Sequence, residues 1–593
     1  MKYGNLTFWL FLCFVMSGIL SGAEAYEITV SDLDRYKFNL ERTSTGFVLA
    51  PKYFVDEVDP NIRPKETGGK VEGFAARNEW QSAGFVIYAT EDLNNVHISI
   101  SDLQGPGDNI LSSEIMRIRL NRRVKQRLAP RVPWDNVVTR AALLEPANTF
   151  GLPAGHFKEV TITFQIPSNQ KEGVYQGKVE VSSAQGQSAS LPVEIEVLPF
   201  RLKPSKKKQY GMYYHSMSMR QKDRERVLAA LRDMREHYVN HLYGYFGIRF
   251  IEEDGNFVPV YDELKKGLEL MREAGFTGSA IVRSGMTRLD SKLVEEKLLT
   301  ADSNQWPEDK LEALYRGAEQ AMKGLEAIKK EYPDIGIIVT HMDEVFRQER
   351  FVRYARLTDA IRKANPKQQV YITLHNIPRS WTREMLNRID PYVDVRGYNG
   401  HGLELWIQGN HKFKRLAQEM KKTGDTAWMY HNPNRPYYVA KWSRIINGLF
   451  MWWAPVKVHI PFRYRTIREQ PFKFIHNMGY TIASPEDGVT PIALRNWEAF
   501  RLGAQDVFYF AMLEELVNKA REKKLKEAAR ASLWLNKIQW LCPRAEDIQE
   551  MDNNRSPLIE KVAERLDGKE LERIRHHTAE LIINLRESLS IKD

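Results

Sequence analysis

Cysteine is scarce in this 593-residue sequence, which contains only Cys13 and Cys542. Cys13 lies in an apolar run near the start of the chain. If that run is removed, one thiol remains, which excludes an internal disulfide framework. The sequence also lacks the zinc spacing H-E-x-x-H, a P-loop, and a G-x-G-x-x-G after the first strand of a βα unit. Folding must therefore rest on burial of apolar side chains, and we expect no metal or organic cofactor.

Long apolar segments are equally scarce. The one extended run, residues 8–20, is shorter than the roughly 20 residues that a membrane-spanning helix needs. Lys2 precedes this run, and Ala23-Glu24-Ala25 follows it in the pattern of a signal-peptide cleavage site. We predict a signal peptide over residues 1–25 and an exported protein, periplasmic or extracellular, with no stable membrane insertion after cleavage. An uncleaved membrane anchor is the alternative.

A large excess of one charge is also absent. The 86 Lys and Arg residues against 76 Asp and Glu leave a formal net charge of +10, which is modest for 68.9 kDa. A hydrophobic share of 43% with 27% charged residues is typical of globular chains and excludes bulk disorder and fibrous rods. No nucleic-acid-binding module is recognisable, so nucleic acid is not an expected partner. The basic segment 117–127 is either the solvent face of a strand or a surface that attracts an acidic glycan.

Three kinds of pattern divide the chain, which is also rich in aromatic residues, with 13 Trp, 25 Tyr and 26 Phe. Residues 26–203 alternate polar and apolar positions with period two, which predicts an N-terminal β-sandwich. Residues 204–483 alternate short apolar strands with amphipathic helices, which predicts a central (β/α)8 barrel. Residues 484–593 are mostly helical, with a barrel-closing helix over 494–520 and a C-terminal helical extension that includes 525–541. The predicted fold class is multidomain α/β plus β.

Eight apolar segments are the expected barrel strands, at residues 210–214, 239–245, 278–282, 336–340, 370–374, 393–397, 426–430 and 457–462. The strongest helical patterns between them cover residues 224–238, 261–274, 311–331 and 351–364. Eight units over about 260 residues fit a (β/α)8 barrel in number and size. A doubly wound open sheet is the alternative, although it would normally be shorter.

Candidate functional residues follow from the barrel, because such folds build their sites where the strands end, on the carboxyl face. The polar and aromatic residues at or after these ends are Tyr213, His215, Tyr245, Arg283, His375, Asn376, Tyr398, Asn399, Tyr430 and Trp453. Rings that stack on sugar faces and polar groups that orient hydroxyls favour a hydroxylated ligand. His341, Asp343 and His375 could also be read as a metal cluster. No zinc-type spacing accompanies them, so strand-end histidines with structural partners are the favoured interpretation.

Asp343 and Glu344 form the only adjacent carboxylate pair at a predicted strand end. Two close carboxylates do not ionise independently, so one of them can keep a proton and act as a general acid, as glycoside hydrolysis requires. Sequence neighbours are poorly placed to flank a sugar at the roughly 5 to 10 Å separation of ordinary glycosidase pairs. They suit substrate-assisted catalysis, in which the 2-acetamido oxygen of the sugar attacks its own anomeric carbon. The alternative interpretation is an acidic pair that caps the following helix.

Several segments resemble glycoside hydrolase family 123. They are residues 73–82 (GFAARNEWQS), residues 173–177 (GVYQG), residues 198–200 (LPF) and residues 496–506 (NWEAFRLGAQD). The resemblance covers nearly the whole mature chain, and the Asp343-Glu344 pair stands where that family carries its catalytic pair. It implies a β-N-acetylgalactosaminidase that works through an oxazoline intermediate. Asp343 would then orient the acetamido group and Glu344 would be the general acid and base.

Two other functions remain open at this point. One is a barrel glycosidase of different specificity, which would use Glu344 with a carboxylate from another strand. The other is a non-catalytic glycan-binding protein that keeps the aromatic mouth. In each case the expected partner is a glycan or glycoconjugate, and the sequence does not fix the oligomeric state.

Overall fold

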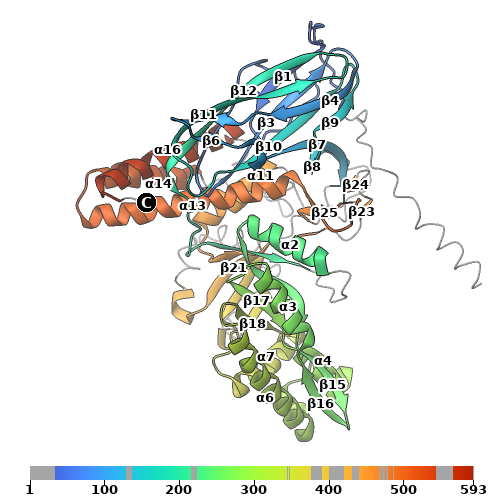
Figure 1. The fold of residues 1–593 in the computed structure, drawn as a ribbon. Helices are drawn as coiled ribbons and strands as arrows, with labels where there is room; N and C mark the ends of the chain where they lie inside the picture. The colour runs from blue at the N-terminus through green and yellow to red at the C-terminus, as the bar shows by residue number, and fades with distance from the viewer. Residues whose placement is uncertain are drawn as a thin grey trace, which may run out of the picture.

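The computed structural model describes residues 34–127, 137–214, 224–343, 345, 348–374, 390–399, 418, 420–430, 440–465, 469–470, 474–475, 479–484, 486–541 and 565–591. The predicted signal peptide, residues 1–25, lies outside this range. Figure 1 shows the N-terminal strands at one end, the parallel barrel at the other, and the long helices α13, α14 and α16 beside the junction between them. No helix within the described part of the chain is long and apolar enough to cross a membrane.

The N-terminal region forms two seven-stranded sheets. The first contains β1 (Phe47–Lys52), β3 (Trp80–Ala89), β10 (Phe157–Gln165), β7 (Met116–Arg127), β8 (Val137–Glu145), β24 (Phe474–Ile475) and β23 (Glu469–Gln470). The second contains β2 (Val71–Arg77), β12 (Ser188–Arg201), β11 (Gly173–Ser182), β4 (Leu93–Ile100), β9 (Thr149–Leu152), β5 (Leu103–Gln104) and β6 (Ile110–Leu111). Pairing is antiparallel except between β2 and β12 and between β7 and β24.

One apolar core lies between these sheets, built from the inward residues that the period-two alternation supplies. Ala83, Phe85 and Ile87 of β3 meet Val179 of β11 and Ile195 of β12 in this cluster. Every residue of β3 is buried. The other face of this strand is covered as well, because Gln505 of helix α13 (Arg495–Glu522) donates a hydrogen bond to the Trp80 carbonyl. Helix α13 thus contacts one end of the outer face of the first sheet, and Tyr36, Phe38 and Leu40 pack against Val86 and Tyr88 toward the other end.

Eight parallel strands form the second body of the fold. They are β13 (Gln209–Tyr213), β14 (Val239–Gly247), β17 (Ser279–Arg283), β18 (Gly336–Thr340), β19 (Tyr371–Leu374), β20 (Val395–Asn399), β21 (Thr426–Tyr430) and β22 (Val458–His459). Around the sheet they follow one another in chain order, and a bridge between Val339 and Val370 nearly closes the ring between β18 and β19. All eight predicted strands are present in this nearly closed barrel.

Helices occupy the connections between barrel strands, as the amphipathic patterns predict. They are α2 (Arg224–Glu236), α3 (Asp262–Glu273), α4 (Met286–Leu293), α5 (Glu296–Leu299), α6 (Glu308–Glu331), α7 (Gln348–Ala364), α11 (Ala440–Ile445) and α12 (Met451–Trp453), with a π-helical turn over Ile446–Phe450. Two short hairpins, β15 (Arg249–Glu253) with β16 (Asn256–Val260) and β25 (Thr481–Ala483) with β26 (Pro491–Ala493), complete the strands. Long helices α13, α14 (Glu527–Leu541) and α16 (Gly568–Ser588) follow.

Helix α13 is not amphipathic in its first half, where every residue from Arg495 to Phe510 is buried. A helix enclosed by protein on every face should be apolar throughout, yet this one carries buried charges. Glu498 pairs with Arg119 of β7 at 2.6 Å, and Asp506 pairs with Arg444 of α11 at 2.8 Å and with Arg575 of α16 at 2.6 Å. These ion pairs tie the N-terminal sheets, the barrel helices and the C-terminal helices to one central element.

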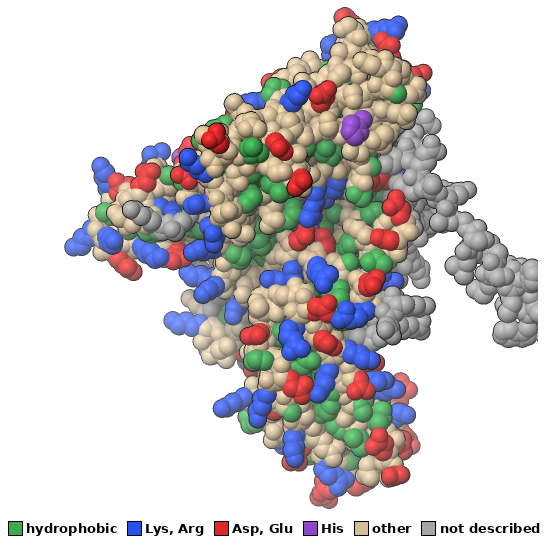
Figure 2. Space-filling view, viewed as in Figure 1, with side chains coloured by type: hydrophobic (Ala, Val, Ile, Leu, Met, Phe, Trp, Pro, Cys, Tyr) green, Lys and Arg blue, Asp and Glu red, His purple; other side chains and the backbone are tan. Residues whose placement is uncertain are grey.

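The basic segment 117–127 lies in the first N-terminal sheet, and several of its arginines have acidic partners. It forms strand β7, and these partners come from distant parts of the chain. Arg119 pairs with Glu498 at 2.6 Å and Arg122 with Glu145 at 2.8 Å, and Arg123 lies 3.5 Å from Glu159. Figure 2 shows acidic and basic side chains interspersed on the visible face, with no broad area of one sign. Arg119, Arg122 and Arg123 therefore have acidic partners, whereas Arg117 and Lys125 are exposed.

Candidate active site

Asp343 follows the barrel strand β18 by three residues and is half-buried. Hydrogen bonds from two neighbouring helices fix the backbone of this turn. The Thr287 hydroxyl of α4 donates to the His341 carbonyl at 2.7 Å, and the Arg350 guanidinium of α7 donates to the Asp343 carbonyl at 3.0 Å. Glu344, the other half of the predicted pair, lies outside the described residues, so the structure gives the position of Asp343 only.

His341 supports the same turn from behind. Its ring is buried, its Nδ1 lies 2.7 Å from the Ser284 hydroxyl, and it packs edge-on against Tyr354 of α7. Burial lowers the pKa of His341 to about 3, so the ring is neutral at physiological pH. Because the next turn of chain carries Asp343, a change in the His341 ring would move the carboxylate.

Three tyrosines point into the barrel from different strands beside this turn. Tyr213 of β13 stacks on Tyr243 of β14 with ring centroids 4.4 Å apart, and the Tyr213 hydroxyl lies 3.1 Å from the Tyr371 hydroxyl of β19. All three side chains are at most 1% exposed. They belong to the apolar cluster that fills the barrel, which also contains Trp428. The barrel interior below the site is thus a stack of rings with hydroxyl groups at its upper edge.

The charge of Asp343 acts on these tyrosines. Burial is the largest cause that raises the pKa of Tyr213, Tyr243 and Tyr371, and the negative charge of Asp343 raises each further. Burial and the negative charge of Asp343 also raise the pKa of Tyr245, and the positive charge of the nearby Arg283 offsets part of this rise. All four phenols are therefore neutral at physiological pH. An acceptor next to several neutral O–H donors is the arrangement that hydroxyl and amide groups of a ligand require.

The rim of the site is formed by residues that are less deeply buried. Strand β14 is irregular between Tyr243 and Gly247, where its pairing with β17 shifts register, and Tyr245 has a φ of 51° there. A bulge of this kind re-aims a side chain, and Tyr245 is half-buried at the mouth. The exposed guanidinium of Arg283 lies 5.1 Å from the centre of the Tyr245 ring.

Five of the predicted site residues are brought together at this end of the barrel: Asp343, Tyr213, Tyr245, Arg283 and Tyr430. The Tyr430 ring ends strand β21 and lies 6.2 Å from the Tyr213 ring between centroids. Glu344, His215, His375 and Asn376 lie outside the described residues, and so does the side chain of Asn399, whose backbone ends β20 opposite Tyr430.

The prediction that Tyr398 contacts substrate is wrong. Tyr398 is fully buried and belongs to the cluster outside the barrel wall, with Leu374 and Met429, its direct neighbours on β19 and β21. Side chains alternate between the two faces of a strand. Val395 of the same strand points into the barrel, so Tyr398, three residues later, points toward the surrounding helices.

The prediction for Trp453 is also wrong, because this residue lies at the opposite end of the barrel. Trp453 ends helix α12, which precedes strand β22, so it approaches the amino ends of the strands. The Lys208 ammonium, just before β13, donates to the Ala454 and Val456 carbonyls, which places this segment at that end. The Trp453 ring packs against Phe450 with centroids 6.2 Å apart, as part of the core.

Tyr371 and Thr373 lie beside the site residues but were not among the predicted residues. The prediction considered strand ends, whereas Tyr371 begins strand β19 and reaches the site from inside the barrel. The alternation of side chains along the strand could have identified Tyr371. Tyr371 and Thr373 stand two residues apart, so they share one face of the strand, and both hydrogen-bond with the Tyr213 hydroxyl, at 3.1 and 3.4 Å. Among the described residues, no group of three His, Cys, Asp or Glu side chains could hold a metal ion.

Comparisons with known proteins were made for sequence and for fold. Residues 52–183 match the Glycoside hydrolase 123 N-terminal domain. The fold matches that of a family 123 glycoside hydrolase from Clostridium perfringens, studied for glycolipid glycan hydrolysis, with a TM-score of 0.68 and 12% identity over 92% of this chain and 100% of that one. A family 39 glycoside hydrolase from Bacteroides cellulosilyticus gives a TM-score of only 0.35, at 10% identity over 73% and 81% of the two chains. No curated protein matches by sequence. Residues 52–183 are thus similar to a family 123 N-terminal domain, and the chain as a whole shares the fold of a family 123 glycoside hydrolase.

Proposed function

We propose that this protein is an exported, retaining glycosidase that removes β-linked N-acetylgalactosamine by substrate-assisted catalysis. The observation that carries the proposal is the position of Asp343. Asp343 follows barrel strand β18, and its negative charge contributes to the raised pKa of four tyrosines, three of them fully buried. A 2-acetamido group has one N–H donor and one carbonyl acceptor, and these residues supply a partner for each.

The roles of the groups follow from their chemistry. Asp343 accepts the acetamido N–H, which directs the acetamido oxygen toward the anomeric carbon and stabilises the positive charge that develops as that oxygen attacks. The hydroxyl of Tyr245, which is half-buried at the mouth and packs on Tyr243 with ring centroids 4.8 Å apart, donates to a sugar oxygen. Because this phenol is packed and neutral, it acts as a fixed donor and needs little reorganisation during the reaction.

Glu344, the next residue along the chain, is the general acid and base in this scheme. As the acetamido oxygen forms its bond to the anomeric carbon, the glycosidic bond breaks and the leaving oxygen takes the Glu344 proton. The product is a cyclic oxazolinium ion, the protonated form of the oxazoline, whose N–H stays hydrogen-bonded to the Asp343 carboxylate. Water then loses a proton to Glu344 and attacks the same carbon, which opens the ring and restores the original configuration. The nucleophile belongs to the substrate, so this reaction needs no metal or organic cofactor.

Two further observations support a glycan substrate of this kind. The Clostridium perfringens enzyme that shares this fold was studied for glycolipid glycan hydrolysis, and the proposed substrate here is likewise a glycoconjugate. The predicted signal peptide would bring the protein to the compartment where such glycans are met. Ion pairs hold Arg119, Arg122 and Arg123 of strand β7, which lowers the positive charge available to an acidic glycan and favours a neutral sugar.

The proposal is tested with Asp343→Asn and Glu344→Gln, assayed on an aryl β-N-acetylgalactosaminide. Loss of general acid and base catalysis typically costs about 10²- to 10⁴-fold in rate, which is the expected effect of Glu344→Gln. Asp343→Asn should also lower kcat severely, because the amide no longer accepts the acetamido N–H. The matched control is Asp334→Asn, an exposed residue before the amino end of the same strand β18.

The outcomes separate the alternatives. A glycosidase that pairs Glu344 with a carboxylate on another strand would lose activity in Glu344→Gln and keep most of it in Asp343→Asn. A non-catalytic glycan-binding protein would release no aryl alcohol in any variant and would bind the glycoside equally well in wild type and Glu344→Gln. Either result would contradict the proposed function.

A further inference from the structure

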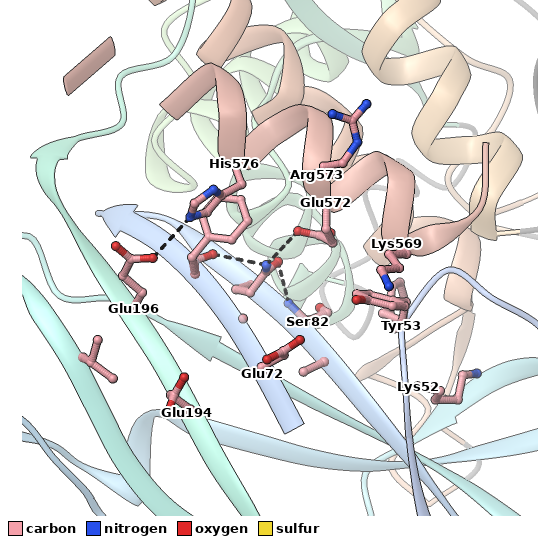
Figure 3. Close-up of a pocket in the computed structure, with 16 residues that line it drawn as sticks. Lys52, Tyr53, Glu72, Ser82, Glu194, Glu196, Lys569, Glu572, Arg573 and His576 are labelled. Carbon is pink, nitrogen blue, oxygen red and sulfur yellow. Dashed lines mark hydrogen bonds and ion pairs between the residues drawn. The ribbon is translucent and has the colours of Figure 1, made fainter. Parts of the chain in front are cut away.

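A second cavity lies between the N-terminal sheets and helix α16, on residues that the barrel site does not use. Its volume is about 400 Å³, within the range of roughly 300 to 1,000 Å³ that small-molecule sites occupy. Figure 3 shows its walls, with side chains of α16 on one side and strands of the N-terminal sheets on the other. The segments that meet there are more than 500 positions apart in sequence at their extremes, Lys52 and His576.

One polar wall of this cavity is formed by carboxylates from two paired strands. Glu72 of β2 pairs in parallel with Glu194 of β12, and Glu196 stands two residues further along β12, so the three carboxylates project on one face of the sheet. Helix α16 faces them with residues spaced three and four apart, which share one side of a helix: Lys569, Glu572, Arg573 and His576. The cavity is thus the seam between a carboxylate-bearing sheet face and a mixed helix face.

The charges in this seam are already compensated. Glu194 pairs with Lys70 at 2.6 Å, and Glu196 lies 3.3 Å from the His576 ring. Glu572 pairs with the buried Arg444, and its other oxygen lies 3.4 Å from the Gln81 amide. A phosphate or another anion would meet several carboxylates, and a cation would compete with partners in place. The paired groups instead offer donors and acceptors side by side, which is what adjacent hydroxyl groups need.

Ring surfaces complete the lining. The Phe74 ring meets the His576 ring edge-on with centroids 4.9 Å apart, and Tyr53 stands beside Lys569 (Figure 3). Burial and the surrounding carboxylates, Glu72 first among them, raise the pKa of Tyr53, so its hydroxyl stays a donor at physiological pH. Aromatic faces next to charge-compensated polar pairs match a ligand that has both an apolar face and a rim of hydroxyls.

From these observations we propose that the cavity is a second glycan-binding site, which takes one or two neutral sugar rings. The family-matched segment 52–183 supplies Tyr53, Glu72 and Phe74, and helix α16 lies outside that segment and provides the opposite wall. The site does not depend on the reaction at the barrel. A glycan held there raises the local concentration of a linked sugar at the barrel mouth, where geometry allows both to be engaged.

The test is carboxyl footprinting of the full chain, with lactose as the neutral probe. A carbodiimide and an amine label exposed carboxylates, and Glu72, Glu194 and Glu196 are 54%, 32% and 46% exposed as side chains. Peptide mass spectrometry then reads each position separately, so binding at the barrel does not contribute. Lactose should protect these three residues several-fold, with saturation as its concentration rises. Labelling of Glu253, an exposed residue on the β15–β16 hairpin, should not change.

Variants link the protection to the cavity. Tyr53→Ala removes a ring from the lining and should abolish protection, whereas Tyr53→Phe keeps the ring and should retain part of it. Val174→Trp, at a lining position that is 46% exposed, fills the cavity and should also abolish protection. Ile110→Ala is the matched control, since this exposed residue of the same sheet lies outside the cavity.

Three results would overturn the proposal. They are labelling that lactose does not change, protection that persists in both Tyr53→Ala and Val174→Trp, and protection by tetramethylammonium but not by lactose. The last would identify a cation site. Because lactose carries no 2-acetamido group and the readout is not turnover, none of these outcomes depends on the proposed barrel reaction.

Discussion

Replacement of Arg575 by Leu would test the junction that holds the parts of the molecule together. Arg575 of α16 is fully buried. Its guanidinium donates to Asp506 of α13 at 2.6 Å, to the Leu502 carbonyl at 2.7 Å and to Glu79, in the turn between β2 and β3, at 3.3 Å. One side chain therefore links the C-terminal helix, the central helix and the N-terminal sheets.

The expected cost follows from what the leucine leaves behind. Removing one partner from a buried ion pair typically destabilises a protein by about 3 to 5 kcal/mol, because the other charge stays buried. Asp506 keeps Arg444, and Glu79 keeps the Tyr509 hydroxyl and the Ala76 N–H. Burial already raises the pKa of Glu79 to about 7, so this carboxyl can take up a proton when the guanidinium is lost. We therefore expect Arg575→Leu to lower the free energy of unfolding by about 3 kcal/mol, at the lower end of this range.

Arg573→Leu is the matched control, on the same helix and two residues away. Its side chain is 52% exposed and pairs with Glu570 at 2.6 Å, and surface pairs of this kind contribute at most about 1 kcal/mol. Urea unfolding followed by circular dichroism compares the two variants with wild type. A clear fall in the unfolding midpoint is expected for Arg575→Leu alone. Equal midpoints for both variants would refute the idea that this buried network holds the junction.

Further predictions concern the site and the pH dependence of stability. His341→Phe should lower kcat with little change in KM, and Ser284→Ala should have the same effect to a smaller degree, because both act on the position of Asp343. Tyr371→Phe removes the hydroxyl that lies 3.1 Å from that of Tyr213 and should slow hydrolysis without unfolding the barrel, as kinetics and circular dichroism would show. The pKa of Glu79 is about 7 in the folded protein against 4.5 for a free carboxyl group. Its contribution to the free energy of unfolding is therefore fully present below pH 4.5 and is lost as the pH rises through 7. Glu79→Gln should flatten the dependence of the melting temperature on pH across this window.

Each of these predictions has a result that would contradict it. A rise in KM with unchanged kcat in His341→Phe would assign this ring to substrate binding and not to positioning. Wild-type kinetics in Tyr371→Phe would exclude its hydroxyl from the reaction. An unchanged pH slope of the melting temperature in Glu79→Gln would mean that another buried group titrates in this range.

The barrel strands could be predicted closely from sequence. Parallel strands buried on both faces are continuous apolar runs, and such runs are easy to locate. The face of the strand to which each side chain points is harder to predict, because moving the strand register by one residue exchanges the two faces. That is why Tyr398 was assigned to the mouth although it points outward, and why Tyr371, at the start of its strand, was not recognised.

Interactions between distant segments were beyond the reach of sequence patterns. The arginines of β7 form a basic segment locally, and their partners lie between 23 positions away, at Glu145, and 379 positions away, at Glu498. The buried charges of α13 look like solvated helix positions for the same reason. Trp453 was misplaced because a helix after a barrel strand returns the chain to the amino ends, away from the mouth. The position of Asp343 after a barrel strand could be predicted because the carboxylate pair and the apolar strand before it are both local signals.

The central claim is that the 2-acetamido group of the sugar is the nucleophile at this barrel. It is tested most directly by side-by-side hydrolysis of aryl β-glycosides of N-acetylgalactosamine, N-acetylglucosamine and galactose by the mature chain. The account predicts release from the N-acetylgalactosaminide and very slow turnover of the galactoside, which has no internal nucleophile. Appreciable cleavage of the aryl β-galactoside would contradict the account.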